Sequence, residues 1–463
     1  MQKISARKLL AGLKELPEEQ DVQITTVVTD SRRILPQCVF VCFVGNRVDG
    51  HNFAKEAVER DTAFVVAERP VEGVPQEKLV LVSSSLQAMV TMAANYRRCF
   101  SPVVVGVTGS VGKTTTKEFC YAVFSAFRET LKTEGNQNNE IGMPNTIFRL
   151  SDNTAYAVVE MGMSNLGEIS RLSKAAKPSV GIITCIGVSH LESLGSRENI
   201  LKAKLELCDG LEQGAPLVLN GDDEYLWNAE LPSHVRPVWV SIDNPQATIR
   251  AENIRVKHGK TIFTIVDKNH GMVETAIPTI GNHNVYNALL AYGAAVSLGL
   301  SPARAAAALE RYQTTGMRQR LVEHQGVTVI EDCYNASPDS MKAAFAAMQQ
   351  LPANRRCALV GDMLELGSVS QQAHKETAEL AKHAGVEMLL CYGPQSQETA
   401  THAKELGIPQ VVWSQDKKEM ANILIDQMKK GDLLLVKASR GMQLEDILKE
   451  YYEATQQKGV EID

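Results

Sequence analysis

The chain has 463 residues, 44% of them hydrophobic, and its 48 basic and 54 acidic residues give a net charge of −6. We expect about three globular domains from this length, no nucleic-acid partner because no basic block occurs, and no membrane span because no run of about 18 apolar residues exists. Nine scattered cysteines without a Cys-x-x-Cys pair are typical of free thiols in a reducing cytosol.

The first expected unit covers residues 1–83. Apolar and β-branched patterns predict a helix at 5–16 and strands at 25–29, 38–43 and 63–66. The N-terminus leads into no long apolar core, so we expect no signal peptide and a cytoplasmic protein. A polar, Gly-rich loop at 45–53 holds Arg47, Asp49 and His51. Ligand-binding residues concentrate on loops, although composition alone favours an ordinary turn here.

A second expected unit, residues 84–313, opens with a helix at 84–98, where apolar side chains recur at helical spacing. The β-branched run 103–107 then predicts a buried strand. Gly109 and Gly112 follow, and glycine permits backbone conformations that other residues avoid. A helix that starts after such a turn presents unpaired N–H groups and the positive end of its dipole, which together can cradle phosphate.

The spacing of this turn is Gly-x-x-Gly-Lys-Thr-Thr, whereas the standard P-loop has another glycine five places before Gly112, where Val107 stands. A Gly-rich turn with a surface lysine is the alternative, but strand, glycines and helix in this order favour a nucleotide site. Lys113 would reach the β- and γ-phosphates, and the Thr114 hydroxyl would hold magnesium. No Gly-x-Gly-x-x-Gly occurs, which disfavours a dinucleotide-binding fold. The expected phosphate-binding residues are Gly109, Ser110, Val111, Gly112, Lys113, Thr114 and Thr115.

Two further short strands, 156–160 and 180–184, alternate with helical stretches, which predicts a parallel sheet. Glu160 ends the first, and His190 follows the second. Ligands of such sheets gather at the carboxyl ends of strands, so both side chains should face the crevice of the Gly-rich turn. A carboxylate and an imidazole there suit a second divalent metal; a hydrogen-bonded loop histidine is an equally good explanation. Composition alone predicts that the Lys204 side chain is solvated.

Residues 248–277 predict an antiparallel addition that pairs around 257–260. A helix over 283–299 follows. The stretch before and at its start, 281–287, could hydrogen-bond a base or simply cap the helix; its polar residues include Asn282, His283 and Asn287.

A third expected unit, residues 314–463, begins after the boundary at 314–316. Strands at 327–331, 358–361, 388–391, 411–413 and 433–437 alternate with helices, which predicts a doubly wound, Rossmann-like domain. Asp332 and Asn335 follow its first strand, where they could hold ribose or base or simply form a strand–helix turn. The turn after the last strand could hold a carboxylate or be only a basic turn; it contains Lys437, Ser439 and Arg440.

These pieces in this order resemble the Mur ligase family, ATP-dependent enzymes that add amino acids to the bacterial peptidoglycan precursor, and the similarity covers nearly the whole chain. The resemblance implies a shortened P-loop, a metal-site pair in Glu160 and His190, and a carbamylated lysine (N6-carboxylysine) at Lys204, which composition could not assign. With Lys113, these would form the catalytic set. The implied nucleotide contacts are Asn282, His283, Asn287, Arg318, Asp332 and Asn335.

Within the family, five stretches are similar to the branch that adds D-alanyl-D-alanine to a UDP-linked muramoyl tripeptide: 29–32, 49–53, 135–142, 334–338 and 361–367. This resemblance implies ATP and two magnesium ions as cofactors, UDP-MurNAc-tripeptide and D-alanyl-D-alanine as substrates, and a monomer. The implied substrate contacts are Ser31, Arg47, Asp49, His51, Asn138, Asn139, Lys437, Ser439 and Arg440. A nucleotide-switch ATPase and a folylpolyglutamate synthase are the alternatives.

The expected architecture is therefore α/β with three domains. They are a small α/β N-terminal domain (1–83), a central P-loop domain with a parallel sheet (84–313), and a C-terminal doubly wound domain (314–463).

Overall fold

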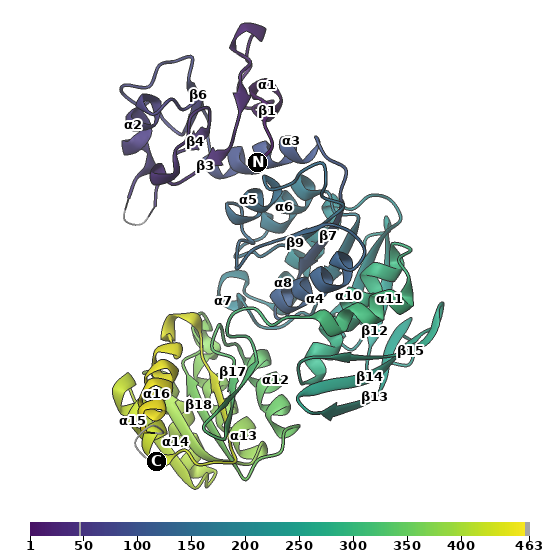
Figure 1. The fold of residues 1–463 in the computed structure, drawn as a ribbon, viewed down its shortest axis with the longest axis vertical. Helices are drawn as coiled ribbons and strands as arrows, with labels where there is room; N and C mark the ends of the chain where they lie inside the picture. Colours follow the sequence, from purple (N-terminus) through teal and green to yellow (C-terminus); the bar gives the residue numbers. More distant parts are fainter. Residues whose placement is uncertain (46–47, 459–463) are drawn as a thin grey trace.

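The computed structural model describes residues 1–45 and 48–458, so Arg47 lies outside the described residues. Three α/β units follow one another along the chain, each built on its own sheet (Figure 1). This arrangement confirms the predicted α/β class. Across the two described ranges, no helix is both long and apolar enough to cross a membrane.

The first unit contains a four-stranded parallel sheet in the order β3-β4-β5-β6 and a separate antiparallel pair, β1-β2. Its elements are β1 (Ile4–Ser5), α1 (Ala6–Leu9), β2 (Gln23–Ile24), β3 (Val27–Val28), β4 (Val39–Val41), α2 (Ala54–Glu59), β5 (Phe64–Ala67) and β6 (Leu79–Leu81). The predicted helix 5–16 is wrong in length. Helix α1 ends at Leu9, and Gly12 adopts a left-handed φ of +80°, which a continuing helix cannot contain.

Helix α3 (Ser85–Arg97) joins the first unit to the second, and it confirms the helix predicted at 84–98. Its Asn95 amide donates to the Leu9 carbonyl at 3.0 Å, while the Tyr96 hydroxyl donates to the Leu150 carbonyl at 2.9 Å. Both residues are buried, and a single hydrophobic core runs from the first unit through α3 into the second. The first two units therefore pack as one body.

The second unit is built on a nine-stranded sheet in the order β15-β14-β13-β12-β11-β10-β7-β9-β8. Its strands are β7 (Val103–Thr108), β8 (Thr130–Lys132), β9 (Tyr156–Glu160), β10 (Val180–Ile183), β11 (Ala215–Asn220), β12 (Val235–Ser241), β13 (Ile249–Lys257), β14 (Lys260–Asp267) and β15 (Gly271–Ile277). The seven strands β7 to β13 all run parallel to one another, whereas β14 and β15 add antiparallel beyond β13. Strand β7 lies between β9 and β10. The ends of these three strands, which carry the predicted site residues, therefore lie side by side.

The predicted pairing around 257–260 is confirmed by the β13–β14 hairpin. His258 and Gly259 form its two-residue turn with φ values of +51° and +71°. Positive φ at both central positions is the type I′ geometry, which matches the twist of the flanking strands.

Helices cover both faces of the central sheet. They are α4 (Lys113–Ser125), α5 (Gly142–Ile147), α6 (Glu168–Ala176), α7 (Leu191–Leu194), α8 (Arg197–Leu205), α9 (Glu224–Trp227), α10 (Asn282–Ser297) and α11 (Pro302–Ala308). Successive strand residues point to opposite faces, so Val104 packs in the core shared with α3, α6 and α8, and Val105 packs in the core beneath α4 and α10. The Phe119 ring of α4 stacks on Tyr312 with centroids 4.0 Å apart, which ties α4 to the end of the unit.

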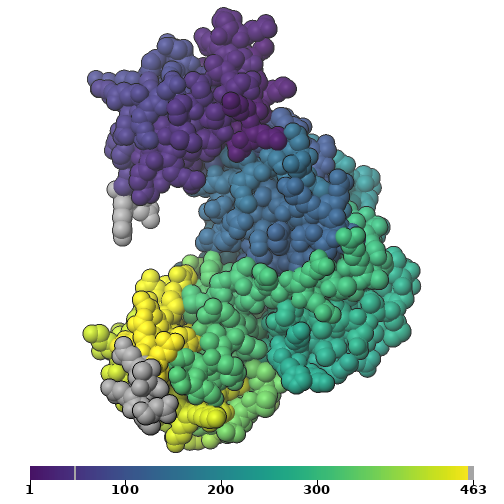
Figure 2. Space-filling model, viewed as in Figure 1, coloured from purple at the N-terminus to yellow at the C-terminus, as the bar shows by residue number. Residues whose placement is uncertain are grey.

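The third unit has a six-stranded sheet in the order β16-β17-β21-β18-β19-β20, parallel except for β16. Its elements are β16 (Arg320–His324), β17 (Val327–Glu331), α12 (Pro338–Gln349), β18 (Arg355–Gly361), α13 (Ser370–His383), β19 (Val386–Tyr392), α14 (Ser396–Glu405), β20 (Gln410–Ser414), α15 (Lys417–Gln427), β21 (Asp432–Lys437) and α16 (Glu445–Lys458). All five predicted strands are confirmed. A wide notch, open on the left of the view, separates the first and third units, and the second unit joins them on the right (Figure 2).

Candidate active site

The Gly-rich turn after β7 has the geometry of a phosphate cradle. Gly109 and Gly112 have φ values of +143° and +85°. A Cβ on Gly109 would lie 1.9 Å from Thr184 Oγ1, and one on Gly112 would lie 2.7 Å from Asn287 Oδ1, so both conformation and space require glycine. Helix α4 begins directly after Gly112 without a side-chain cap, which leaves its first N–H groups free for an anion.

Lys113 folds back over this turn. Its Nζ donates to the Gly109 carbonyl at 2.8 Å and to the Ser110 carbonyl at 3.1 Å. Burial lowers the pKa of Lys113, and the nearby Glu160 carboxylate opposes that shift. The ammonium is thus held at the cradle by two carbonyl oxygens, which phosphate oxygens could replace.

Glu160, at the end of β9, reaches the first turn of α4. Its Oε1 accepts from Thr114 Oγ1 at 3.1 Å and from Asn138 Nδ2 at 2.8 Å. Its Oε2 is buried without a hydrogen-bond partner, and Lys117 Nζ lies 3.8 Å away. A buried charged oxygen without a hydrogen-bonding partner is costly. An oxygen-seeking cation such as magnesium fits at this position.

His190 and Lys204 lie near Lys113 and form a cluster of nitrogen groups. Burial, followed by the charges of Lys204 and Lys113, lowers the pKa of His190 to about 4. Lys204 is 1% exposed, its Nζ has no hydrogen-bond partner, and burial together with Lys113 holds its pKa well below the ordinary value. Both shifts favour the neutral form of the side chain, the form in which imidazole binds metal and an amine acts as a nucleophile.

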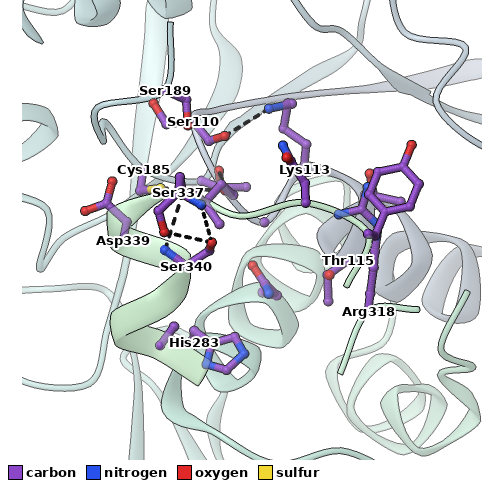
Figure 3. A pocket seen from close by; sticks show the side chains of 18 of the residues that line it. Ser110, Lys113, Thr115, Cys185, Ser189, His283, Arg318, Ser337, Asp339 and Ser340 are labelled. Carbon is purple, nitrogen blue, oxygen red and sulfur yellow. Dashed lines mark hydrogen bonds between the residues drawn. The ribbon is translucent and has the colours of Figure 1, made fainter. Parts of the chain in front are cut away.

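A cavity of about 570 Å³ lies between the second and third units, within the size range of small-molecule sites. Figure 3 shows Lys113 and Arg318 on one side and the start of α12 on the other. Among the residues expected from sequence, it is lined by Ser110, Val111, Gly112, Lys113, Thr114, Thr115, Asn138, Asn139, Glu160, His190, His283, Asn287, Arg318, Asp332, Asn335 and Lys437. In the described part of the chain, no group of three His, Cys, Asp or Glu side chains forms a metal site by itself.

Helix α10 faces this cavity with residues that sequence reasoning only partly found. Asn282 is exposed and accepts from Gln350 Nε2 at 3.4 Å, outside the cavity lining. Asn284 lines the cavity instead and donates to Gln319 Oε1, which also lies 2.9 Å from His283 Nε2. Asn284 and Asn287 are three residues apart and so share one face of the helix. That spacing is the signal that could have found Asn284.

The third unit contributes a cation and a carboxylate that bind each other. Lys437 Nζ donates to Asp332 Oδ2 at 2.8 Å and to the Asn335 carbonyl at 2.9 Å. Ser439 and Arg440 lie outside the cavity lining. The Ser439 hydroxyl accepts from the Leu364 N–H at 2.9 Å, and Arg440 pairs with Glu445.

The Arg318 guanidinium, by contrast, lies over the Tyr334 ring, 3.9 Å from its centre, and lines the cavity. Tyr334 also lines the cavity; it opens the stretch 334–338 that carries the family resemblance, but it was not among the expected contacts.

The expected residues of the first unit lie apart from this cavity. Ser31 opens a short 3₁₀ helix, and Asp49 caps another by accepting from the His51 N–H at 2.9 Å. His51 is buried and uses both ring nitrogens, on Asp49 Oδ1 at 2.7 Å and on the Glu68 N–H at 3.2 Å. Arg69, and then the His51 contacts, hold the pKa of Asp49 well below its usual range. These hydrogen bonds hold the loop in place and leave neither ring nitrogen of His51 free to bind a ligand.

Gly142→Ala is expected to lower kcat about tenfold, at the lower end of the effect of losing a partner that supports a metal ligand, which is the role expected of Glu160 from the sequence. An added Cβ would lie 2.4 Å from the Gln137 Cα and 2.6 Å from its carbonyl carbon, so the backbone that carries Asn138 must move away from Glu160. Steady-state kinetics and a melting curve would measure the effect. Asn138→Ala serves as the comparison, and wild-type kcat in Gly142→Ala would contradict the expected link.

Comparison with known families covers all three units. The family model "Mur ligase family, catalytic domain" matches residues 23–97, "Mur ligase middle domain" matches 107–295, and "Mur ligase, glutamate ligase domain" matches 317–440.

A UDP-N-acetylmuramoyl-tripeptide–D-alanyl-D-alanine ligase of Bacillus subtilis is 37% identical over 452 residues, 96% of this chain and 97% of the relative. Among solved structures, MurF from Acinetobacter baumannii has a TM-score of 0.87 at 27% identity, covering 98% of this chain and 99% of that one. MurF ligase from Thermotoga maritima in complex with ADP has a TM-score of 0.85 at 28% identity, covering 96% and 100%.

Proposed function

The chain belongs to the Mur ligase family, and on that premise we propose that it is the ligase that joins D-alanyl-D-alanine to UDP-N-acetylmuramoyl-tripeptide. It is an ATP-dependent enzyme of peptidoglycan synthesis, and ADP and phosphate are its other products. The observation that carries the proposal is one cavity in which the P-loop, Glu160 and His190 meet, with the unpartnered amine of Lys204 nearby.

The reaction that this geometry serves has two steps. A carboxylate oxygen at the end of the tripeptide attacks the γ-phosphorus of ATP, and the bond to the β-phosphate oxygen breaks to release ADP. The amine of the dipeptide then attacks the acyl carbon, loses a proton and displaces phosphate. Both reactants of the first step are anions, so the site must supply positive charge. Lys113 and the free N–H groups of α4 supply it from this chain.

Magnesium fits the donors that the chain offers. Thr114 and Glu160 would hold one ion, since one Glu160 oxygen is buried without a hydrogen-bond partner. His190 and an N-carboxylated Lys204 would hold a second. When bound, magnesium would neutralise charge on the phosphates and the acceptor carboxylate.

Lys204 has the properties that carboxylation requires. The neutral amine attacks CO₂ and loses a proton, which leaves an anionic carboxylate on the nitrogen. Burial lowers the pKa of this amine and so favours its neutral form, and among the described residues its Nζ has no hydrogen-bond partner. The product would convert a group without a partner into an oxygen ligand that a hard metal accepts.

The remaining contacts extend this assignment over the three proposed domains, 1–83, 84–313 and 314–463. The first would bind UDP near Ser31 and Asp49. The third would close over ATP with Arg318 and Asp332 and would meet the dipeptide carboxylate near Lys437, Ser439 and Arg440, with a hinge near 314–316. The enzyme would act as a monomer, because no step needs a second copy, and in the cytoplasm, where its nucleotide substrates occur.

A coupled assay tests this function. Phosphate release from ATP is expected to be sustained only when UDP-muramoyl tripeptide and D-alanyl-D-alanine are both present. The reason is that phosphate leaves the acyl phosphate only when the dipeptide amine attacks it. Omitting either substrate should reduce steady release to background. Phosphate release that does not depend on either peptide substrate would instead identify a nucleotide-switch ATPase.

A further inference from the structure

The loop that carries His190 is held from two domains. At its start, the Ile186 N–H donates to Asp223 Oδ2 at 2.7 Å, and Arg197 donates to the Ile186 carbonyl, so the second unit fixes this end. The following residues reach the third unit. The Val188 N–H donates to Asp339 Oδ2 at 3.2 Å, and Asp339 belongs to the first turn of α12.

The approach at this contact leaves no room for a side chain. A Cβ on Gly187 would lie 2.0 Å from Asp339 Oδ2 and 3.0 Å from its Cγ, while its nearest P-loop neighbour, Ser110 Cβ, would be at an ordinary 3.4 Å. Figure 3 shows Asp339 near Cys185 at the start of α12, on the side of the pocket opposite Arg318. The absence of a side chain at Gly187 therefore allows the Asp339 carboxylate to approach the second unit.

A second contact from the third unit touches the other side of His190. Gly367, in the turn before α13, lies so close to α7 that an added Cβ would be 3.3 Å from Glu192 Cγ. His190 lies between the two contacts with a φ of +64°, a conformation that non-glycine residues keep only when their surroundings enforce it. The third unit thus holds the backbone before this strained residue through Asp339 and packs against the Glu192 side chain after it.

We propose that Asp339 is a positioning residue that couples docking of the third domain to the placement of His190, through its hydrogen bond to the Val188 N–H. His190 would then adopt its working position only when the domain that closes over ATP is docked. The role of His190 in this inference rests on the proposed function, whereas the contact between Asp339 and Val188 does not depend on it.

Two substitutions at one position separate the bond from the charge. Asp339→Ala and Asp339→Asn lose the same negative charge, and with it the same favourable interaction with the start of α12. Only asparagine keeps an oxygen that can accept from Val188. The comparison of the two variants therefore isolates the hydrogen bond, and Asp339→Asn is the matched control.

The direct measurement is hydrogen exchange at the Val188 amide in the full chain with ADP present. Exchange is expected to be about fivefold faster in Asp339→Ala than in Asp339→Asn, the size of effect that one ordinary hydrogen bond gives. In the coupled assay, kcat should be lower in Asp339→Ala by a similar factor, with equal melting temperatures. Equal exchange, or equal kcat, in the two variants would overturn the proposal.

A double variant checks the geometry. Gly187→Ala alone should also speed Val188 exchange and lower kcat, because its methyl group displaces the Asp339 carboxylate. Gly187→Ala combined with Asp339→Ala should be no worse than Asp339→Ala alone; additive losses would mean independent sites and would contradict the coupling. Hydrogen exchange can be measured without ligase activity. If the variants show the expected exchange but the wild type does not ligate, the proposed function is wrong while the Asp339–Val188 contact is still supported.

Discussion

Lys204→Ala is expected to lower kcat by about 10³-fold or more, at the upper end of the loss caused by removing one preorganised group that stabilises developing charge, while ATP still binds. The Lys204 amine is buried without a partner and lies outside the cavity lining, so its loss should leave the nucleotide contacts intact. What disappears is the anionic ligand that carboxylation would create.

Isothermal titration with ADP and the coupled assay would separate binding from turnover in this variant. Lys202→Ala, on an exposed position of the same helix, is the matched control. Formate or acetate should partly restore turnover to Lys204→Ala, because the truncated side chain leaves space for a carboxylate. Isotopically labelled bicarbonate should label the wild type and not the variant. Near-normal turnover without added carboxylate would remove Lys204 from the mechanism.

Glu160→Gln is expected to lower kcat by about 10²- to 10³-fold and to weaken magnesium binding with little change in the fold. The amide oxygen can still accept from Thr114 and Asn138, whereas the amide nitrogen replaces the unpartnered oxygen and cannot bind a cation. The substitution therefore changes one atom at the place where magnesium would be held.

Two measurements check this substitution. Turnover as a function of magnesium concentration should give a curve shifted to higher concentrations, and manganese binding followed by electron paramagnetic resonance should weaken in parallel. ADP binding without metal should stay near the wild-type level. An unchanged metal dependence would place the ion elsewhere.

The phosphate site could be predicted because its signals are local. A β-branched strand, two glycines and a helix start are adjacent in the chain, and the parallel sheet then sets Glu160 beside them. Lys204 had no such signal, because its burial comes from packing between α8 and distant elements. Asn282 and Asn284 differ by only two positions, and the rotation of α10 alone decides which one faces the cavity.

Three of the strands that the sequence analysis did not predict have a weak pattern. Strand β8 is a three-residue edge strand with no fully buried side chain. Strand β12 contains Arg236 and Pro237, both exposed, which interrupt the apolar pattern. Strand β16 is a polar edge strand that pairs antiparallel with β17. In each case the neighbouring strand, and not the strand's own composition, determines the structure.

The continuous core through α3 has a consequence for which substrates the enzyme can use. Because the first two units pack as one body, the span from the UDP site proposed near Ser31 and Asp49 to the phosphate cradle would be a fixed length. That body would then act as a molecular ruler for the acceptor. A peptide one residue shorter would leave its carboxyl end short of the γ-phosphorus, and one residue longer would overshoot it, however the third unit moves.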